Sequence, residues 1–158
     1  MARNFSLQAK RNINATSADE PLLVLVEITH ADLAVPARFV NDTADIDVEG
    51  HAFLACRFDL TLPDDQDEQV PGAKLEVDNI GRDLTQWLEY SGGGKGARCR
   101  LIMVLRSNPS NLEFDMTMDL SGLVVTNFRI GGDLGFKNTL MQSACTMRFD
   151  PTTSPGIF

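Results

Sequence analysis

Residues 111–120 alternate between apolar and polar side chains along their whole length, which restricts the possible folds more than any other stretch. The even positions carry the apolar side chains of Leu112, Phe114, Met116, Met118 and Leu120. The odd positions between them carry Glu113, Asp115, Thr117 and Asp119. Because side chains on a strand point alternately to its two faces, the pattern predicts a β-strand with one face on a core and the other in water.

Other segments carry strand signals as well. Residues 56–62, 73–78 and 97–106 show the same alternation. Residues 22–28 are apolar at both even and odd positions, which is typical of a central strand covered on both faces, so a second layer must pack over it. Further strands are expected at 38–40, 46–48, 52–62, 123–130 and 140–149.

The order of these segments predicts the fold class. Residues 97–106 and 111–120 flank Ser107-Asn108-Pro109-Ser110, a strong turn signal, and therefore form a hairpin. Gly131-Gly132-Asp133 separates the last two strands. With about eight strands and no alternation of strands with helices, the chain is predicted to be mainly β, a β-sandwich or a partly open barrel.

A short helix and two terminal segments complete the expected organisation. Asn79 can cap a helix whose Leu84, Trp87 and Leu88 share one face, which predicts that Trp87 packs in the core. Residues 1–20 are polar and are expected to form an N-terminal arm, either extended and mobile or a short helix that docks onto a neighbour. The predicted division is thus an arm at 1–20, a β-domain at 21–150 and an irregular tail at 151–158.

The charge balance disfavours two classes of partner. The chain of 158 residues has 14 basic and 22 acidic residues, which gives a net charge of −8. Such a charge repels phosphate backbones and anionic lipid headgroups, so neither nucleic acid nor membrane is expected as a partner. The first residues lack the apolar core of a secretory signal, and we expect the chain to stay in the cytoplasm until assembly.

The sequence contains no recognised catalytic or metal-binding motif. His30 and His51, the two histidines, lie beside no nucleophile motif. The three cysteines lie far apart on inward-facing strand positions, so we expect buried free thiols at Cys56, Cys99 and Cys145. We therefore expect no catalytic residue, no metal site and no cofactor.

Two loops resemble binding motifs only superficially. Residues 64–68 contain Asp64, Asp65, Asp67 and Glu68, but they lack the glycine and the distal glutamate of a helical calcium loop, so a solvated loop is expected. Residues 91–96, Ser-Gly-Gly-Gly-Lys-Gly, contain the glycines and lysine of a phosphate loop. However, Ala97 and a strand follow where that motif requires Ser or Thr and a helix, which indicates a flexible linker.

Five stretches, taken in order, resemble a family of small minor tail proteins from tail-tip operons of long-tailed bacteriophages. They are residues 22–30, LLVLVEITH; 39–42, FVND; 58–65, FDLTLPDD; 75–84, LEVDNIGRDL; and 154–158, SPGIF. The resemblance covers nearly the whole chain, and its strength lies in the order and spacing of individually weak motifs. The polar arm at 1–20 and the loop at 92–96 depart from the family pattern.

The resemblance implies a non-enzymatic component of the virion, located at the tail tip. It implies a protein like the distal tail protein, which forms a ring of three-fold or six-fold symmetry with copies of itself and contacts the tail tube protein and the tail-tip hub proteins. We expect the arm, the loops at 63–71 and 91–96 and the tail to contact neighbouring subunits. The expected contact residues are Phe5, Leu7, Ile13, Asp64, Asp65, Asp67, Glu68, Lys95, Pro155, Ile157 and Phe158.

Two other classes of protein remain open from the sequence. A carbohydrate-binding module that recognises a host surface would also be a β-sandwich, but it would normally expose aromatic side chains, whereas most of those here lie on inward positions. A small β-sandwich enzyme would need reactive groups that converge from distant parts of the chain. Glycan binding would favour the first class, and loss of function on substitution of the histidines or cysteines would favour the second.

Overall fold

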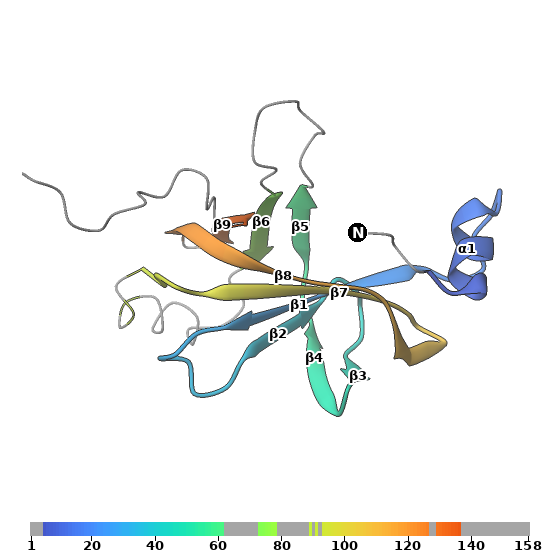
Figure 1. Ribbon diagram of the computed structural model, residues 1–158, viewed down its shortest axis with the longest axis horizontal. Helices are drawn as coiled ribbons and strands as arrows, with labels where there is room; N and C mark the ends of the chain where they lie inside the picture. Colours follow the sequence, from blue (N-terminus) through green and yellow to red (C-terminus); the bar gives the residue numbers. More distant parts are fainter. Residues whose placement is uncertain are drawn as a thin grey trace, which may run out of the picture.

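The computed structural model describes residues 5–61, 73–78, 89, 91, 93–126 and 129–136. The described residues contain one helix, α1 (Leu7–Asn14), and nine strands in a single sheet (Figure 1). The strands are β1 (Leu22–Thr29), β2 (Ala37–Val40), β3 (Ile46–Val48), β4 (His51–Ala55), β5 (Phe58–Thr61), β6 (Ala73–Asp78), β7 (Arg98–Leu105), β8 (Asn108–Val125) and β9 (Arg129–Gly135). Their order in the sheet is β3-β4-β2-β1-β7-β8-β9-β6-β5.

The connection between β4 and β5 shows that this sheet is strongly curled. Only Cys56 and Arg57 join these strands, although they lie near opposite ends of the strand order. The Cys56 N–H donates to the Val40 carbonyl at 3.0 Å, and the Asp78 N–H donates to the Arg57 carbonyl at 3.1 Å. Since each residue spans at most about 3.6 Å, the two ends of the sheet must lie close together. The end strands β3 and β5 do not pair with each other, so the predicted mainly β fold, a β-sandwich or partly open barrel, is confirmed.

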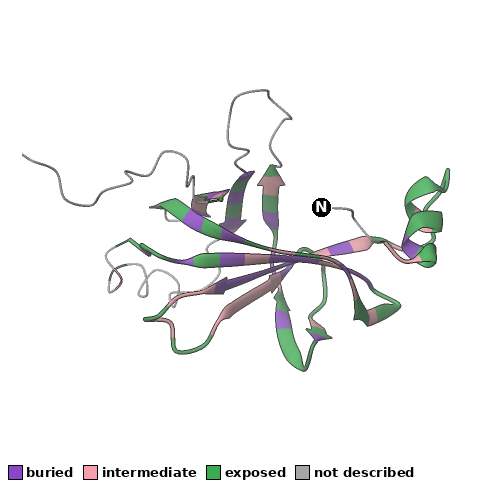
Figure 2. Cartoon of the chain, viewed as in Figure 1, coloured by how far each residue is buried: buried purple, intermediate pink, exposed green. Residues whose placement is uncertain are grey.

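The two central strands are buried on both faces, as predicted for residues 22–28. Strand β1 pairs with β7 along its whole length, from Leu22 opposite Leu105 to Thr29 opposite Arg98. Alternate residues of β1 enter two separate apolar clusters: Val26 packs in the larger inner cluster, whereas Leu25 packs in a second, outer cluster. Figure 2 shows the buried positions concentrated in this centre of the sheet.

The β3–β4 hairpin supplies the second layer that the apolar strand requires. Val48 and Phe53 from this hairpin pack with residues of β1 and β7 in the outer cluster. The hairpin also continues the sheet, because β4 pairs in parallel with β2. The hairpin thus covers the outer face of the central strands and extends the edge of the sheet.

The hairpin of β7 and β8 is confirmed, but a bulge breaks the alternation at its start. Met103 lies opposite Phe114, whereas the next residue, Val104, lies opposite Leu112. The extra residue, Glu113, has no partner in this register, so Leu112 packs on the outer cluster while Phe114 packs on the inner one. The prediction that Leu112 shares a face with Phe114 was therefore wrong.

The predicted strand at 123–130 was also wrong. Strand β8 ends at Val125, and the chain reverses so that Val125 lies opposite Ile130 of β9. Thr126 closes this reversal: its N–H donates to the Arg129 carbonyl at 2.8 Å, and its hydroxyl accepts from the Arg129 N–H at 2.9 Å. Polar Thr126 and Arg129 inside an otherwise apolar segment were the missed turn signal.

Gly131-Gly132-Asp133 lies inside β9 and does not separate two strands. A Cβ atom on Gly132 would lie 2.8 Å from Leu120 Cδ1 and 3.0 Å from Leu123 Cδ2. The missing side chain of Gly132 leaves room for the close approach of β8 side chains, and the residue does not form a turn.

Other boundaries also differ from the predictions or fall outside the described residues. Residues 52–62 form two strands, β4 and β5, because the chain passes from one end of the sheet to the other at Cys56 and Arg57. The predicted helix at 79–88, the loop at 63–71, the strand at 140–149 and the tail at 151–158 lie outside the described residues.

Candidate functional site

Helix α1 lies at one end of the molecule, beside the turn of the β7–β8 hairpin (Figure 1). Ser6 caps its N-terminus: the Ser6 hydroxyl accepts from the Ala9 N–H at 3.1 Å. An isolated helix of eight residues is marginal in water, so contacts with the rest of the chain must stabilise it. Of the two forms expected for the arm, the short helix is the one observed for residues 7–14.

The first of these contacts is a set of hydrogen bonds between Ser6 and Glu113. The Glu113 carboxylate accepts from the Ser6 N–H at 2.7 Å, from the Ser6 hydroxyl at 2.6 Å and from Asn111 Nδ2 at 2.8 Å. Burial alone would raise the pKa of Glu113, but these bonds and the nearby charge of Lys10 outweigh it and lower the pKa below its usual value. The bulge at the start of β8 thus places an ionised carboxylate under the helix cap.

The second contact joins the helix to the hairpin turn through Glu20. The Glu20 carboxylate accepts from Ser107 N–H at 3.0 Å, from Ser107 Oγ at 2.8 Å and from Gln8 Nε2 at 3.1 Å. Asn12 holds the connection that follows α1, because its Nδ2 donates to the Glu20 carbonyl and its Oδ1 accepts from the Asp19 N–H. Helix α1, the connection at 15–21 and the β7–β8 turn are therefore joined by hydrogen bonds into one unit, which we call the head.

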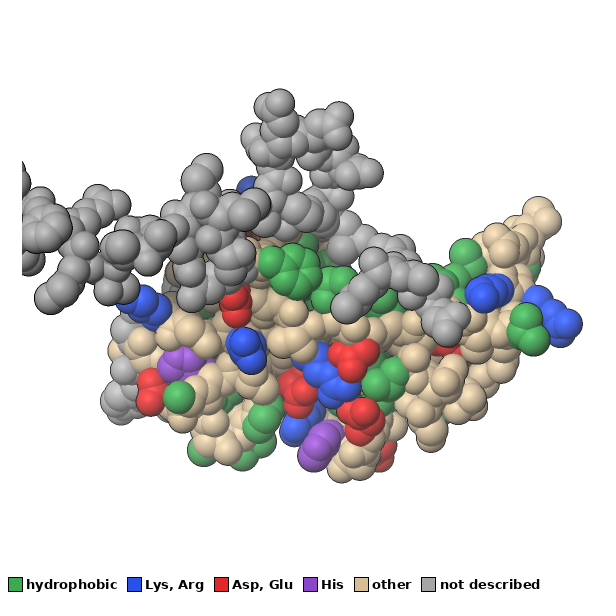
Figure 3. Space-filling model, in the orientation of Figure 1, with side chains coloured by type: hydrophobic (Ala, Val, Ile, Leu, Met, Phe, Trp, Pro, Cys, Tyr) green, Lys and Arg blue, Asp and Glu red, His purple; other side chains and the backbone are tan. Residues whose placement is uncertain are grey.

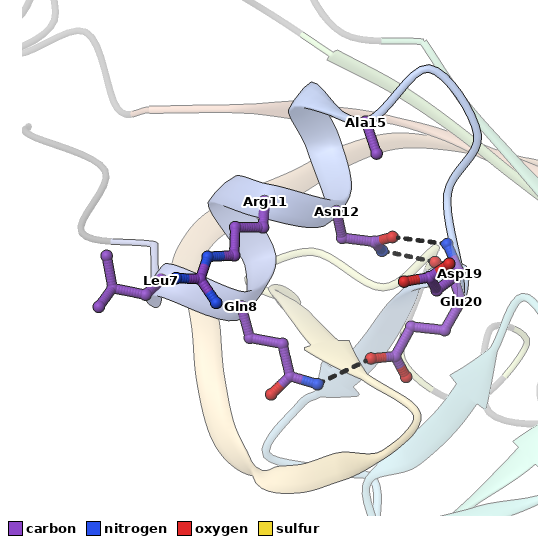
Figure 4. Close-up of a pocket in the computed structure, with 7 residues that line it drawn as sticks. All are labelled: Leu7, Gln8, Arg11, Asn12, Ala15, Asp19 and Glu20. Atoms are coloured by element: carbon purple, nitrogen blue, oxygen red, sulfur yellow. Dashed lines mark hydrogen bonds between the residues drawn. The ribbon is translucent and has the colours of Figure 1, made fainter.

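A groove runs between the helix and the connection that follows it (Figure 4). Its lining residues are Leu7, Gln8, Arg11, Asn12, Ala15, Asp19 and Glu20. In Figure 4, Asn12, Asp19 and Glu20 face one another, whereas the Arg11 side chain extends toward Leu7 on the outer side. Among these lining residues, no two are arranged as nucleophile and base.

The head exposes large apolar side chains to water. Leu7 is 75% exposed and Ile13 is 53% exposed, whereas Ala9 is the one helix residue that is fully buried. In Figure 3, hydrophobic and basic side chains lie side by side over α1. Two exposed large apolar side chains on a helix of eight residues make the head a candidate contact surface.

The expected contact residues fall into three groups. Leu7 and Ile13 belong to α1 of the head, and Phe5 immediately precedes its cap residue Ser6. Lys95 lies in the turn that precedes β7, and because the head lies beyond the other end of this strand, the structure does not bring Lys95 to the head. The remaining residues, Asp64, Asp65, Asp67, Glu68, Pro155, Ile157 and Phe158, lie outside the described residues.

A charged network crosses neighbouring strands on the outer face of the sheet. Arg100 donates to both oxygens of Asp115, at 2.9 and 2.6 Å, and to Glu49 at 2.8 Å. These hydrogen bonds raise the pKa of Arg100. Arg38 Nε donates to Glu27 at 2.7 Å, and Glu27 Oε2 lies 3.8 Å from Arg100. The network joins β2, β1, β7 and β8, so its role is to hold the strands together.

The histidines occupy structural or exposed positions. The Asp32 N–H donates to His30 Nδ1 at 3.1 Å, which leaves the Nε2 proton for the Lys95 carbonyl at 3.0 Å. His30 thus ties the end of β1 to the glycine-rich turn, while His51 is exposed on β4.

Two of the three predicted buried thiols are confirmed. Cys56 and Cys99 are free and buried, and burial raises the pKa of Cys56 and raises the pKa of Cys99 to about 12. Cys145 lies outside the described residues. Within the described ranges, no group of three His, Cys, Asp or Glu side chains is placed to hold a metal ion. In the same part of the chain, no helix combines the length and apolar character needed to cross a membrane.

Comparisons with known proteins give a family and a fold. A family model described as "Domain of unknown function (DUF1833)" matches residues 8–149. No curated protein matches the sequence. Among solved structures, a chain of the "Virion of native gene transfer agent (GTA) particle" is similar, with a TM-score of 0.66 and 12% sequence identity. The similarity covers 92% of this chain and 50% of the virion chain, so the present chain spans about half the length of that protein.

Proposed function

Since the chain belongs to the DUF1833 family, whose model matches most of its length, we propose that it is a structural subunit of a bacteriophage-type virion. The observation that carries this proposal is the similarity of fold to a chain of a gene transfer agent virion, at a TM-score of 0.66 over 92% of the present chain. The proposed role is mechanical: the chain contributes surfaces to an assembly and has no enzymatic activity.

The head is consistent with such a role. Leu7 and Ile13 are exposed, yet they belong to a helix held in place by Glu113 and Glu20. A contact surface fixed in advance loses less conformational entropy when it binds than a disordered arm does. The charged network of Arg100 similarly stiffens the sheet that carries the head.

The finer proposal concerns the position in the particle. We propose a ring-forming distal tail or minor tail protein at the tail tip, which joins the tail tube to the central hub. Its partners are other copies of itself in a three-fold or six-fold ring, the tail tube protein and the hub proteins, with neither nucleic acid nor membrane as a partner. The head, Lys95, the loop at 63–71 and the tail at 151–158 are the proposed contacts between subunits.

Particles made with and without the gene test the proposal. Mass spectrometry of purified particles should detect the chain at a constant ratio to the tail tube protein, and deletion of the gene should leave particles without complete tails. A chain found only in the soluble fraction, with complete tails in its absence, would contradict the proposal.

Deletion of residues 1–18 tests the part assigned to the head. The deleted chain should still fold, because its helix contributes only Ala9 to the buried core, but it should fail to enter tails. Circular dichroism and thermal unfolding of the purified variant provide the folding control. Normal tails that contain the deleted chain would show that the head is not a required contact.

A further inference from the structure

The outer side of α1 presents an apolar side chain next to two basic ones. Leu7 is 75% exposed, and Lys10 and Arg11 lie three and four residues further along, so these side chains are neighbours on the helix surface. Neither Lys10 nor Arg11 forms an ion pair within the described ranges. We call Leu7, Lys10 and Arg11 the basic helix surface.

This surface contrasts with the charge of the whole molecule. Helix α1 contains no acidic residue, whereas the whole chain has a net charge of −8. Two copies that each carry a net charge of −8 repel each other at long range, so a contact between them needs a local pairing of opposite charges. The basic helix surface can supply one side of such a pairing with a second copy of this chain.

The outward face of the β3–β4 hairpin has the complementary character. Ile46 lies opposite Phe53 and both face the outer cluster, so Asp47 and Leu54 point to the opposite face, while Asp45 immediately precedes β3 and is exposed. Leu54 is 55% exposed, and Asp45 and Asp47 are exposed as well. We call Asp45, Asp47 and Leu54 the acidic hairpin surface.

The aspartates of this surface lack basic partners of their own. The neighbouring acids on the same segment are neutralised, since Asp42 pairs with Arg106 and Glu49 pairs with Arg100. In the described part of the chain, neither Asp45 nor Asp47 forms an ion pair, although one Asp45 oxygen accepts from the Ala55 N–H at 2.7 Å. Two carboxylates beside an exposed leucine thus match two cations beside an exposed leucine.

We infer that the basic helix surface of one copy docks on the acidic hairpin surface of the next copy. The inference rests on the proposed function and names the surfaces through which copies of this chain meet. The two surfaces are different and lie on different elements, and Figure 1 shows α1 beyond the end of the sheet, away from β3. A contact between unlike surfaces repeats from copy to copy, and it closes into a ring if the rotation allows.

Two charge-reversed variants test this pairing directly. In Lys10→Glu/Arg11→Glu both surfaces become acidic, and in Asp45→Lys/Asp47→Lys both become basic. Because the charge of Lys10 also acts on Glu113, hydrogen exchange of α1 must show that the helix of the first variant stays docked, and Arg11→Glu alone replaces that variant if it does not. Each variant alone should associate at least roughly tenfold more weakly than the wild type in low salt, because two exposed attractions become repulsions. An equimolar mixture should associate again, because each variant retains one surface that is complementary to the other variant.

Sedimentation velocity at low and high salt measures these outcomes on the full chain. Recovery in the mixture, with loss in each variant alone, supports the inference. Unchanged association of either variant, a mixture as weak as its components, or a wild-type chain that does not associate at any salt concentration would overturn it. These results leave the proposed function intact, because mass spectrometry of particles tests that separately.

Two controls keep the test specific. Lys74→Glu/Arg98→Glu reverses two exposed basic residues elsewhere on the sheet and should associate like the wild type. Asp47→Lys alone preserves the hydrogen bond between Asp45 and Ala55. It replaces Asp45→Lys/Asp47→Lys if that double variant unfolds at a lower temperature than the wild type. If Lys74→Glu/Arg98→Glu weakened association as much as the two test variants do, the effect would be one of general charge and would count against the specific contact.

Discussion

Replacing Glu113 with alanine should release the head without unfolding the sheet. The carboxylate accepts three hydrogen bonds, two from Ser6 at 2.7 and 2.6 Å and one from Asn111 at 2.8 Å. Alanine removes all three and leaves the Ser6 N–H and hydroxyl without their acceptor under the helix cap. Ser6 is half-buried, so these donors are hydrated more fully when the helix leaves the sheet, and the variant therefore favours the undocked helix.

The size of the effect follows from these bonds. Hydrogen bonds to a charged group contribute about 1.5–3 kcal/mol each, and those between neutral groups about 1 kcal/mol, but they are not additive and water replaces part of the loss. We expect the docking free energy of α1 to fall by about 2–3 kcal/mol, which raises the undocked population roughly a hundredfold. Docking of α1 is part of the folded state, so the free energy of global unfolding should fall by at most the same amount, whereas the sheet keeps its own stability because only Ala9 of α1 is fully buried.

Limited proteolysis and hydrogen exchange measure the two free energies separately. Trypsin should cleave the Glu113→Ala variant after Lys10 and Arg11 much faster than the wild type, and the amides of α1 should exchange at a much lower free energy than those of β1 and β7, which stay protected. Ser6→Ala should also speed cleavage and exchange in α1, since it removes the helix cap and one of the three bonds. Unchanged cleavage, or loss of protection in the central strands together with α1, would show that Glu113 does not hold the helix in place.

The pH dependence has a definite sign. The pKa of Glu113 in the folded chain lies below the ordinary value of 4.5, so its contribution to docking is fully present above that value. The contribution is lost as the pH falls from there through the lowered pKa. Trypsin does not cleave in acid, so hydrogen exchange of α1 is the readout. Glu113→Gln should abolish the pH dependence of this exchange.

Three further predictions test the interior and the charged network. Cys99 should resist alkylation by iodoacetamide at about pH 8 in the folded chain and react after denaturation, as read from its peptide by mass spectrometry, because burial raises its pKa to about 12; labelling of the folded chain would show an open core. Arg100→Met should lower the free energy of unfolding by about 1–2 kcal/mol, whereas Arg98→Met on the same strand, 68% exposed, should cost less than about 0.5 kcal/mol; equal effects in chemical denaturation would contradict a structural role of the network. Leu25→Ala, at a position 0% exposed, should cost about 3–4 kcal/mol, whereas Leu54→Ala, at a position 55% exposed, should cost below about 1 kcal/mol, and a reversed order would place the outer cluster incorrectly.

The strand positions could be predicted well because burial imposes a simple period on the sequence. Residues 22–28 are apolar at both even and odd positions, and the structure covers both faces of β1. Residues 97–106 and 111–120 are joined by a strong turn, and their antiparallel pairing follows. These are local signals, and each is decided within a few residues of the chain.

The failures occur where a distant contact outweighs the local pattern. Glu113 occupies a position that reads as solvent-facing, but a bulge turns it under α1, more than a hundred residues away in sequence from its partner Ser6. Gly132 reads as a turn residue, but it is small because Leu120 approaches its backbone. Neither the register of β8 nor the packing against β9 can be read from the alternation of polar and apolar residues alone.

The head could be anticipated only in part. The spaced apolar residues Phe5, Leu7 and Ile13 in a polar segment indicated a contact surface. Its fixation by Glu20 and Ser107 depends on the hairpin turn lying beside the helix, which no local pattern contains. The single acid in the apolar segment 22–28, Glu27, was a usable signal for the charged network, since a buried carboxylate requires a partner.

An electron cryomicroscopy reconstruction of the tail end of the particles would show directly whether this chain is a ring subunit. We expect a ring of copies of this chain between the tail tube and the hub, with α1 of each copy against the β3–β4 hairpin of the next. A complete tail tip in which no density fits the nine-stranded sheet would contradict it.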